Sequence, residues 1–220
     1  MRAASRAYGA LRRLFNAGLL GLAIVMAPAA AGHAAPAVIL AFGDSLTAGY
    51  GLALAESFPS RLEAALREAG VEARVINAGV SGDTTAAGLR RIDWALGENP
   101  ALVILELGAN DGLRGLDPDQ TRANLDAILN RIAAKGARVL LTGMRAPRNL
   151  GPEYAARFDA MFPALAAKHD IAFYPFFLEG VAMDPALNQP DGIHPNPAGV
   201  DVIVRSILPH VRRALTGDGG

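Results

Sequence analysis

The chain has 220 residues, which suits one domain of ordinary size with a full hydrophobic core. It holds 21 basic and 21 acidic residues, but four arginines precede the first acidic residue, Asp44, so the rest of the chain has 17 basic against 21 acidic residues. This mildly acidic part lacks the clustered Lys and Arg of a nucleic acid-binding protein, so we exclude nucleic acid as a partner. The absence of cysteine excludes a disulfide framework, a thiolate nucleophile and a cysteine-ligated zinc.

Residues 1–34 have the pattern of a secretory signal peptide. Four arginines come first, an apolar run of about ten residues follows, and small residues then mark cleavage after Ala31 or Ala34. An uncleaved membrane anchor over residues 14–31 is the alternative, and Arg12-Arg13 loosely matches a twin-arginine export signal. We therefore expect a periplasmic or secreted protein whose residues 35–220 form a single domain.

Five short apolar runs alternate with helical patterns along this domain. The runs are continuous, as in parallel strands that are buried on both faces, and they cover residues 37–42, 74–77, 102–107, 138–142 and 171–174. Apolar stripes with helical spacing lie at 58–69, 89–96, 125–132 and 200–211. This alternation predicts an α/β fold, a three-layer α/β/α sandwich around a parallel sheet. Loops are expected at 108–115, 146–152 and 189–197.

The candidate chemistry begins with a histidine, because a serine nucleophile needs a base and the base needs an acceptor that fixes its tautomer. His33 lies in the predicted signal peptide, and His169 and His210 lie at the end of a helix and within one. His194 alone lies in a loop at the carboxyl edge of the predicted sheet, where open parallel sheets bind ligands. Asp191 precedes it by three residues, a spacing at which a tight turn can bring its carboxylate to the imidazole Nδ1.

The nucleophile must come from another part of the chain. Ser57, Ser60 and Ser206 lie on predicted helices or their caps, which leaves Ser45 and Ser81. Only Ser45 directly follows a strand, so it is the predicted nucleophile.

An acyl-transfer site also needs hydrogen-bond donors for the oxyanion of the tetrahedral intermediate. The candidates are the amide of Ser45 at the start of a helix, the amide of Gly79, and the side-chain amide of Asn110. Taken singly, each of these residues has an ordinary explanation as a cap or turn residue. Their predicted position at one sheet edge, in compatible roles, favours catalysis.

Two other site types were weighed. A metal site would use Asp44, Asp111, Asp191 and His194, but the sequence has no His pair at ligand spacing. The nucleophile elbow of an α/β-hydrolase fails because the segment 43–47 lacks its final glycine.

Two acidic residues near the predicted nucleophile have less obvious roles. Asp44 is interpreted as structural, bonding loop amides beside Ser45. Glu106 lies within a predicted buried strand, where an arginine such as Arg138 or Arg145 is its expected partner, and the sequence assigns it no role.

The segments 43–46, 77–79, 108–111 and 191–194 together resemble the SGNH (GDSL) hydrolase superfamily. Segments 107–115, 175–178 and 191–196 extend the likeness to its subfamily of multifunctional thioesterases, lysophospholipases and arylesterases, over about residues 38–213. The resemblance implies a flavodoxin-like sheet of five strands, the catalytic triad Ser45, Asp191 and His194, and an oxyanion hole from Ser45, Gly79 and Asn110. It also implies a mobile loop over residues 144–154 that covers the acyl chain.

The function expected from these residues is hydrolysis of carboxylic esters and thioesters through an acyl-enzyme. The expected substrates are aryl esters, short to medium acyl esters, lysophospholipids and, in vitro, acyl-CoA. A carbohydrate O-acetyl esterase of the same superfamily and a catalytically silent lipid- or glycan-binding module are the alternatives. We expect a monomer that needs no cofactor or metal, binds a small acyl substrate and makes at most transient contact with membrane lipid.

Overall fold

A computed structural model describes residues 35–217 of the chain. The predicted signal peptide, the alternative anchor and the twin-arginine match lie outside the described residues, as does Ala31; the expected cut after Ala34 lies at their boundary. The described residues belong to one compact unit. Among residues 35–217, no helix is both long enough and apolar enough to cross a membrane.

The centre of this unit is a parallel sheet of five strands, which confirms the predicted fold class. In chain order the strands are β1 (Ala37–Gly43), β2 (Ala73–Gly79), β3 (Leu102–Glu106), β4 (Arg138–Thr142) and β5 (Ala172–Tyr174). They lie side by side in the order β2-β1-β3-β4-β5, every neighbouring pair being parallel. This is the flavodoxin-like order, in which ligands bind where the direction of winding reverses, between β1 and β3.

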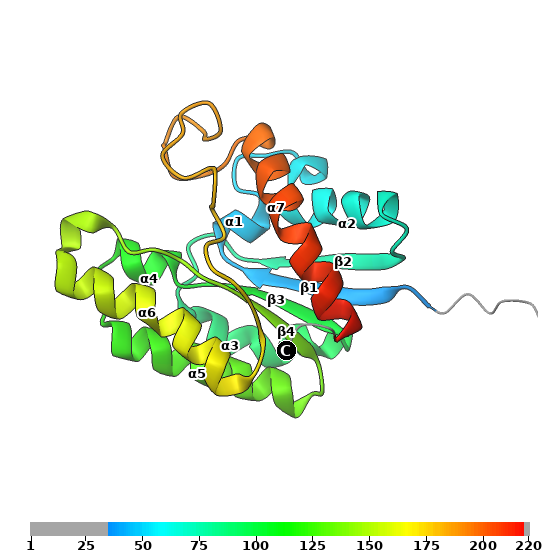
Figure 1. The fold of residues 1–220 in the computed structure, drawn as a ribbon, viewed down its shortest axis with the longest axis horizontal. Helices are drawn as coiled ribbons and strands as arrows, with labels where there is room; N and C mark the ends of the chain where they lie inside the picture. The colour runs from blue at the N-terminus through cyan, green and yellow to red at the C-terminus, as the bar shows by residue number, and fades with distance from the viewer. Residues whose placement is uncertain (1–34, 218–220) are drawn as a thin grey trace, which may run out of the picture. The chain divides into compact units, whose positions relative to one another are not determined.

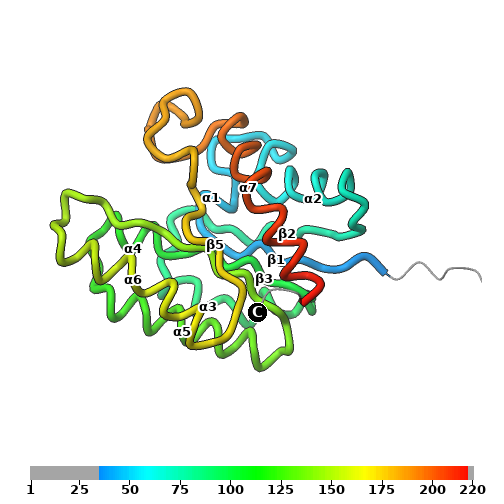
Figure 2. The backbone as a smooth tube through the Cα atoms, in the orientation of Figure 1, coloured from blue at the N-terminus to red at the C-terminus, as the bar shows by residue number. Residues whose placement is uncertain are grey.

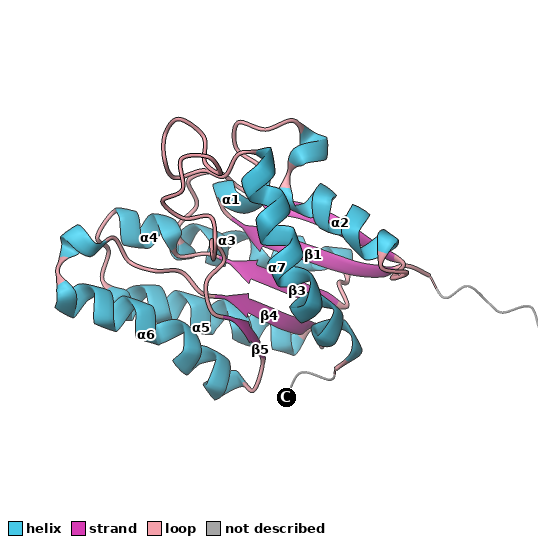
Figure 3. Cartoon of the chain, turned by 45° about the horizontal axis from the view of Figure 1, so that its top comes forward, coloured by secondary structure: helices cyan, strands magenta, loops and turns pink. Residues whose placement is uncertain are grey.

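Helices cover both faces of the sheet (Figures 1 and 3). One face carries α2 (Phe58–Glu68) and α7 (Pro197–Thr216), and the other carries α3 (Thr85–Ala95), α5 (Pro118–Ala134) and α6 (Pro152–His169). Their apolar stripes pack onto the sheet, and all five residues of its central strand β3 are buried. Short helices fill the connections: α1 (Ser45–Ala48), α4 (Ala109–Leu113), and the 3-10 turns Leu54–Glu56, Leu96–Glu98 and Arg148–Leu150.

Two segments predicted as loops contain helix. Residues 109–113 form α4, which at five residues is too short to show an apolar stripe in the sequence. Residues 152–154, within the expected mobile loop, form the first turn of α6, since proline at the start of a helix loses no hydrogen bond and has a suitable φ. The connection that leaves β4 therefore ends at Gly151.

The sheet brings distant parts of the chain together at the carboxyl ends of its strands. Gly43, the last residue of β1, pairs with Gly79 of β2 on one side and with Glu106 of β3 on the other. The long connection from β5 to α7 lies beside α1, as Figures 1 and 2 show from one side, and the side chain of Gln189 donates to the carbonyl of Tyr50 at 2.7 Å. The fold thus places segments near residues 45, 110 and 190 at one edge.

Candidate active site

Ser45 is the first residue of α1 and follows β1 after a single residue, Asp44. Asp44 caps the helix, its Oδ1 accepting from the amide of Leu46 at 3.0 Å. The turn is tight because Gly43 has no side chain: a Cβ there would lie 2.1 Å from Thr47 Oγ1 and 2.5 Å from Glu106 Oε2. Glycine before Asp44 is thus a steric requirement for this placement of Ser45.

The three residues predicted as a triad form a continuous chain of hydrogen bonds. Ser45 Oγ lies 2.9 Å from His194 Nε2, and His194 Nδ1 lies 2.6 Å from Asp191 Oδ2. Since the Asp191 carboxylate can only accept, Nδ1 carries the proton and Nε2 is free to accept the hydroxyl proton of Ser45. The hydrogen bond from His194 is the largest of the effects that lower the pKa of Asp191 to about 2.

The loop that carries Asp191 and His194 is held by its own hydrogen bonds. Asp191 Oδ1 accepts from the amides of Ile193 and His194, each at 3.0 Å. Gln189 donates from its backbone to the carbonyl of His194 at 2.7 Å, and the imidazole packs against the ring of Tyr50 with centroids 4.6 Å apart. Sequence reasoning missed Gln189 and Tyr50, since only their contacts in the fold connect them to the site.

Two of the predicted oxyanion donors, the side-chain amide of Asn110 and the backbone amide of Gly79, are hydrogen-bonded within the protein. Asn110 Nδ2 donates to Asp44 Oδ2 at 3.1 Å and to the carbonyl of Asp83 at 3.0 Å. The amide of Gly79 donates to Asn77 Oδ1 at 3.0 Å. A Cβ on Gly79 would lie 2.3 Å from the amide nitrogen of Ala48, so glycine there lets α1 approach β2. Asn110 lines the same cavity as Ser45 and His194, whereas Gly79 does not.

The expected pairing of Glu106 with an arginine is wrong. Glu106 Oε2 accepts from Thr47 Oγ1 at 2.7 Å and faces the amide of Asp44 at 3.3 Å. Arg138 lies at the opposite, amino-terminal end of β4 and binds the carbonyl of Leu215, and Arg145 pairs with an exposed glutamate. Arg138 is therefore separated from Glu106 by the length of a strand, and Arg145 lies on the surface. The sequence pattern does not reveal either position.

Asp44 and Glu106 form a buried acidic pair. Burial raises the pKa of Asp44 to about 6, an increase that the hydrogen bonds from Leu46 and Asn110 only partly offset. Burial also raises the pKa of Glu106 well above its usual range, and the negative charge of Asp44 raises it further. Asp44 precedes Ser45 in the chain and Asp191 is connected to it through His194, and the environments of their carboxyl groups shift the two pKa values in opposite directions.

The residues that were weighed as metal ligands do not converge. The carboxylate of Asp111 accepts from the amide and hydroxyl of Thr85 at 2.8 and 2.6 Å and from the hydroxyl of Thr121 at 3.2 Å, so it joins α3 to α5. Within residues 35–217, no group of three or more histidine, aspartate or glutamate side chains is arranged to hold a metal ion.

A cavity of about 760 Å³ opens at Ser45 and His194, within the size range of small-molecule sites. Its walls are mainly apolar, with Leu46, Leu113, Met144, Phe176, Met183 and Ile193 among the lining side chains. The connection after β4 borders it through residues 144–148. Two contacts with Asp159 of α6 hold this connection, the amide of Ala146 at 2.8 Å and Arg148 at 2.9 Å. The cavity can therefore receive an apolar group beside the serine.

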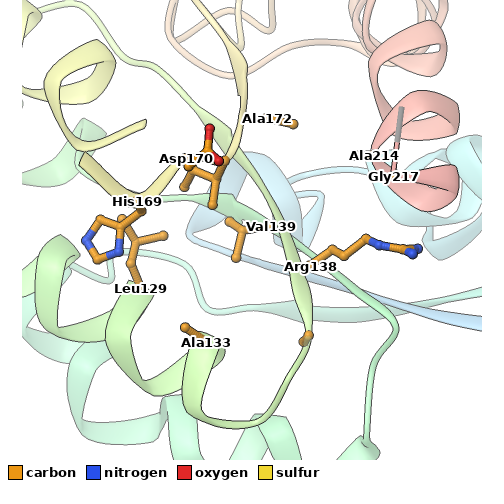
Figure 4. Close-up of a pocket in the computed structure, with 11 residues that line it drawn as sticks. Leu129, Ala133, Arg138, Val139, His169, Asp170, Ala172, Ala214 and Gly217 are labelled. Carbon is orange, nitrogen blue, oxygen red and sulfur yellow. The ribbon is translucent and has the colours of Figure 1, made fainter. Parts of the chain in front are cut away.

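A second cavity of about 310 Å³ lies at the opposite, amino-terminal end of the strands, where β4 and β5 begin. Figure 4 shows His169 and Arg138 on opposite sides of it. His169 Nε2 lies 2.6 Å from Asp126 Oδ1, which ties α6 to α5, and the residues lining this cavity include no serine. The residues suited to nucleophilic catalysis, Ser45, His194 and Asp191, therefore lie at the carboxyl ends of the strands and not at this second cavity.

The raised pKa of Asp44 predicts a specific dependence of stability on pH. Because the folded pKa, about 6, exceeds the reference value of 3.8, its protonated form stabilises the fold below about pH 4, and this contribution is lost as the pH rises through 6. Asp44→Asn removes this dependence. Urea unfolding at pH 4 to 7 should therefore show the free energy of unfolding of Asp44→Asn increasing relative to that of the unchanged protein. A difference that stays constant over this range would contradict the prediction.

Comparison with known proteins agrees with the fold and the motifs. The chain is 40% identical to Esterase TesA of Pseudomonas aeruginosa, over 93% of this chain and 100% of that protein. It is 42% identical to Thioesterase 1/protease 1/lysophospholipase L1 of Escherichia coli, over 74% of this chain and 77% of that protein.

A solved structure and a family model match as well. The crystal structure of AlinE4, an SGNH-hydrolase family esterase, superposes with a TM-score of 0.69 and 53% identity, covering 82% of this chain and 97% of that one. Residues 41–202 match the model of the GDSL-like lipase/acylhydrolase family, a span that contains Ser45, Gly79, Asn110, Asp191 and His194. On these likenesses and on its five-stranded fold, the chain belongs to the GDSL-like lipase/acylhydrolase family, the SGNH hydrolases.

Proposed function

We propose that this protein is an exported serine esterase that hydrolyses carboxylic esters and thioesters through an acyl-enzyme on Ser45. The observation that carries the proposal is the unbroken contact from Ser45 Oγ through His194 to Asp191, at 2.9 and 2.6 Å. Membership of a family of lipases and acylhydrolases, and the names of the relatives, support the same reaction type.

The reaction proceeds in two steps. His194 Nε2 takes the proton of Ser45 as Oγ attacks the acyl carbonyl, and Asp191 stabilises the imidazolium that forms. The tetrahedral intermediate collapses, the bond to the leaving oxygen or sulfur breaks, and His194 returns the proton to the leaving alcohol or thiol. Water then attacks the acyl-enzyme by the same route and releases the acid, so the chain's own residues complete the cycle.

The oxyanion would be stabilised by the amides of Ser45 and Gly79 and by Asn110 Nδ2. Asn110 supports this role by its place in the cavity wall beside Ser45, and Asp44 orients its amide. The amide of Gly79 donates to Asn77 Oδ1 in this structure, so it would have to exchange that partner for the oxyanion of the substrate. Donors of this kind stabilise the transition state more than the ground state when they are held in place beforehand.

The acyl chain would occupy the apolar cavity. Its walls suit hydrocarbon and leave an acetyl group with little to contact, which favours aryl, medium-chain and lysophospholipid esters over acetylated carbohydrate. The relative named thioesterase 1/protease 1/lysophospholipase L1 agrees with this class. Residues 144–148 border the cavity, and their segment would cover the bound chain.

Export would follow from residues 1–34 acting as a signal peptide, with cleavage after Ala31 or Ala34. The basic start, the apolar run and the small residues support this reading. The alignment with the Pseudomonas aeruginosa esterase covers 93% of this chain and therefore reaches into the same segment. A periplasmic or secreted location, a monomeric state and transient contact with membrane lipid stay predictions.

Ser45→Ala should abolish turnover of p-nitrophenyl esters, lowering kcat by about 10⁴-fold or more, because no other nucleophile occupies the position. A fluorophosphonate probe should label the peptide that contains Ser45 and not the variant. Ser81→Ala is the matched control, since Ser81 is exposed and was the other serine near a predicted strand end. Activity without an adduct on the Ser45 peptide would overturn the assignment.

Asn110→Ala should lower kcat by about 10²- to 10³-fold, the typical effect of removing one oxyanion donor, and leave KM nearly unchanged. The loss falls on kcat because the donor acts on charge that forms only in the transition state. Asn130→Ala, on the exposed face of α5, serves as control and should retain full kcat. An effect of Asn110→Ala confined to KM would show that Asn110 binds substrate without stabilising the oxyanion.

The apolar cavity predicts that kcat/KM rises with acyl length. Each buried methylene contributes about 0.8 kcal/mol, or roughly fourfold, until the cavity is filled. A series of p-nitrophenyl esters from acetyl to palmitoyl, measured beside acetylated xylan, tests this directly. Activity confined to acetyl groups would exclude the proposed substrate class.

A further inference from the structure

Glu106 is a completely buried carboxyl group to which the mechanism above gives no task. It is the last residue of β3 and pairs with Gly43 of β1, and Gly43 precedes Ser45 by two residues in the chain. Its Oε1 is one of two buried side-chain polar atoms among the described residues without a hydrogen-bond partner. Burying a carboxyl group with an unpartnered oxygen costs more free energy than burying a hydrocarbon side chain, so Glu106 is a candidate for a role in the site.

The side-chain hydrogen bonds of Glu106 lead to the turn that carries the nucleophile. Its Oε2 accepts from Thr47 Oγ1 at 2.7 Å and from the amide of Asp44 at 3.3 Å. Thr47 lies in α1 and Asp44 is its N-cap, so the carboxyl group contacts the residues on either side of the first turn of that helix. Ser45 stands between them.

Asp44 extends the connection from Glu106 to the oxyanion donor. Its Oδ1 accepts from the amide of Leu46 at 3.0 Å, and its Oδ2 accepts from Asn110 Nδ2 at 3.1 Å. One carboxyl group in β3 therefore fixes the residue that both caps the helix of Ser45 and orients the amide of Asn110.

We propose that Glu106 is a positioning residue for acyl transfer: through Thr47 and the backbone of Asp44 it fixes Ser45 and Asn110 relative to each other. The inference rests on the proposed function, because it assigns Glu106 a task in the reaction of Ser45. A site of this kind needs its nucleophile and its oxyanion donor held together before substrate binds.

The surroundings favour a neutral Glu106. Asp44 raises the pKa of Glu106 by its negative charge, in addition to the larger effect of burial. Of the basic side chains around this turn, Arg91 binds Asp83 and the carbonyl of Gly43, and His194 binds Ser45 and Asp191. Neither is hydrogen-bonded to Glu106. A neutral carboxyl that accepts two hydrogen bonds through one oxygen can be replaced by the amide of glutamine.

The experiment compares Glu106→Gln with Glu106→Leu in the full chain. Glutamine can accept both hydrogen bonds, so kcat should stay within about threefold and the pH profile should keep its shape. Leucine accepts neither, so kcat should fall at least tenfold with KM within about twofold, and fluorophosphonate labelling of Ser45 should slow in parallel. Because partial unfolding lowers the apparent kcat without changing KM, kcat and the labelling rate are expressed per folded molecule, with the folded fraction taken from urea unfolding of each variant.

Thr47→Val provides a second variant for the case in which Glu106→Leu does not fold. It removes one donor to Glu106 Oε2 and should lower kcat severalfold with KM unchanged. Its matched control is Thr142→Val, since Thr142 is equally buried but donates to the carbonyl of Leu105, outside the network. Thr142→Val should leave kcat unchanged.

Each outcome decides a separate point. A loss of kcat in Glu106→Gln as large as in Glu106→Leu would show that a charged Glu106 is needed. Unchanged kcat in Glu106→Leu would show that Glu106 does not position the site. Where Glu106→Leu does not fold, unchanged kcat in Thr47→Val would show the same. Either result would overturn the inference. Ser45→Ala in the same assay tests the proposed function independently, because retained activity there would refute the esterase mechanism whatever Glu106 does.

Discussion

The close packing of α1 against the carboxyl ends of β1, β2 and β3 is the constraint on which the candidate site depends. Gly43 and Gly79 lack the side chains that would collide with Thr47 and with the backbone of Ala48. A Cβ at either position would push the short helix away from the sheet. Because Ser45 is the first residue of that helix, its distance to His194 is set by this backbone contact.

Burial and hydrogen bonding give the carboxyl groups of Asp44 and Asp191 different protonation behaviour and different roles in the site. Asp191 is partly exposed, accepts two backbone amides as well as the imidazole, and stays ionised. Asp44 is buried beside Glu106, so its pKa rises towards neutrality. The exposed carboxylate can therefore stabilise an imidazolium, while the buried pair serves the geometry of the turn.

Tertiary contacts also explain the errors of the sequence-based predictions. Glu106 was expected to pair with an arginine because a buried acid needs a partner, but a threonine hydroxyl and a backbone amide supply its hydrogen bonds. The helix α4 was missed since five residues cannot display a helical stripe. The loop over residues 144–154 was placed too long because its Pro152, interpreted as a loop residue, begins α6.

The sequence by itself determined the fold class, since continuous apolar runs that alternate with amphipathic stripes can pack only as a parallel sheet covered on both faces. It also nominated Ser45, Asp191 and His194, because few serines and histidines follow strands and the motifs resemble one superfamily. Only the tertiary structure decided the contacts of Gln189, Tyr50 and Glu106 with the site. Those contacts join segments that are far apart in the chain, and local sequence patterns carry no information about such distances.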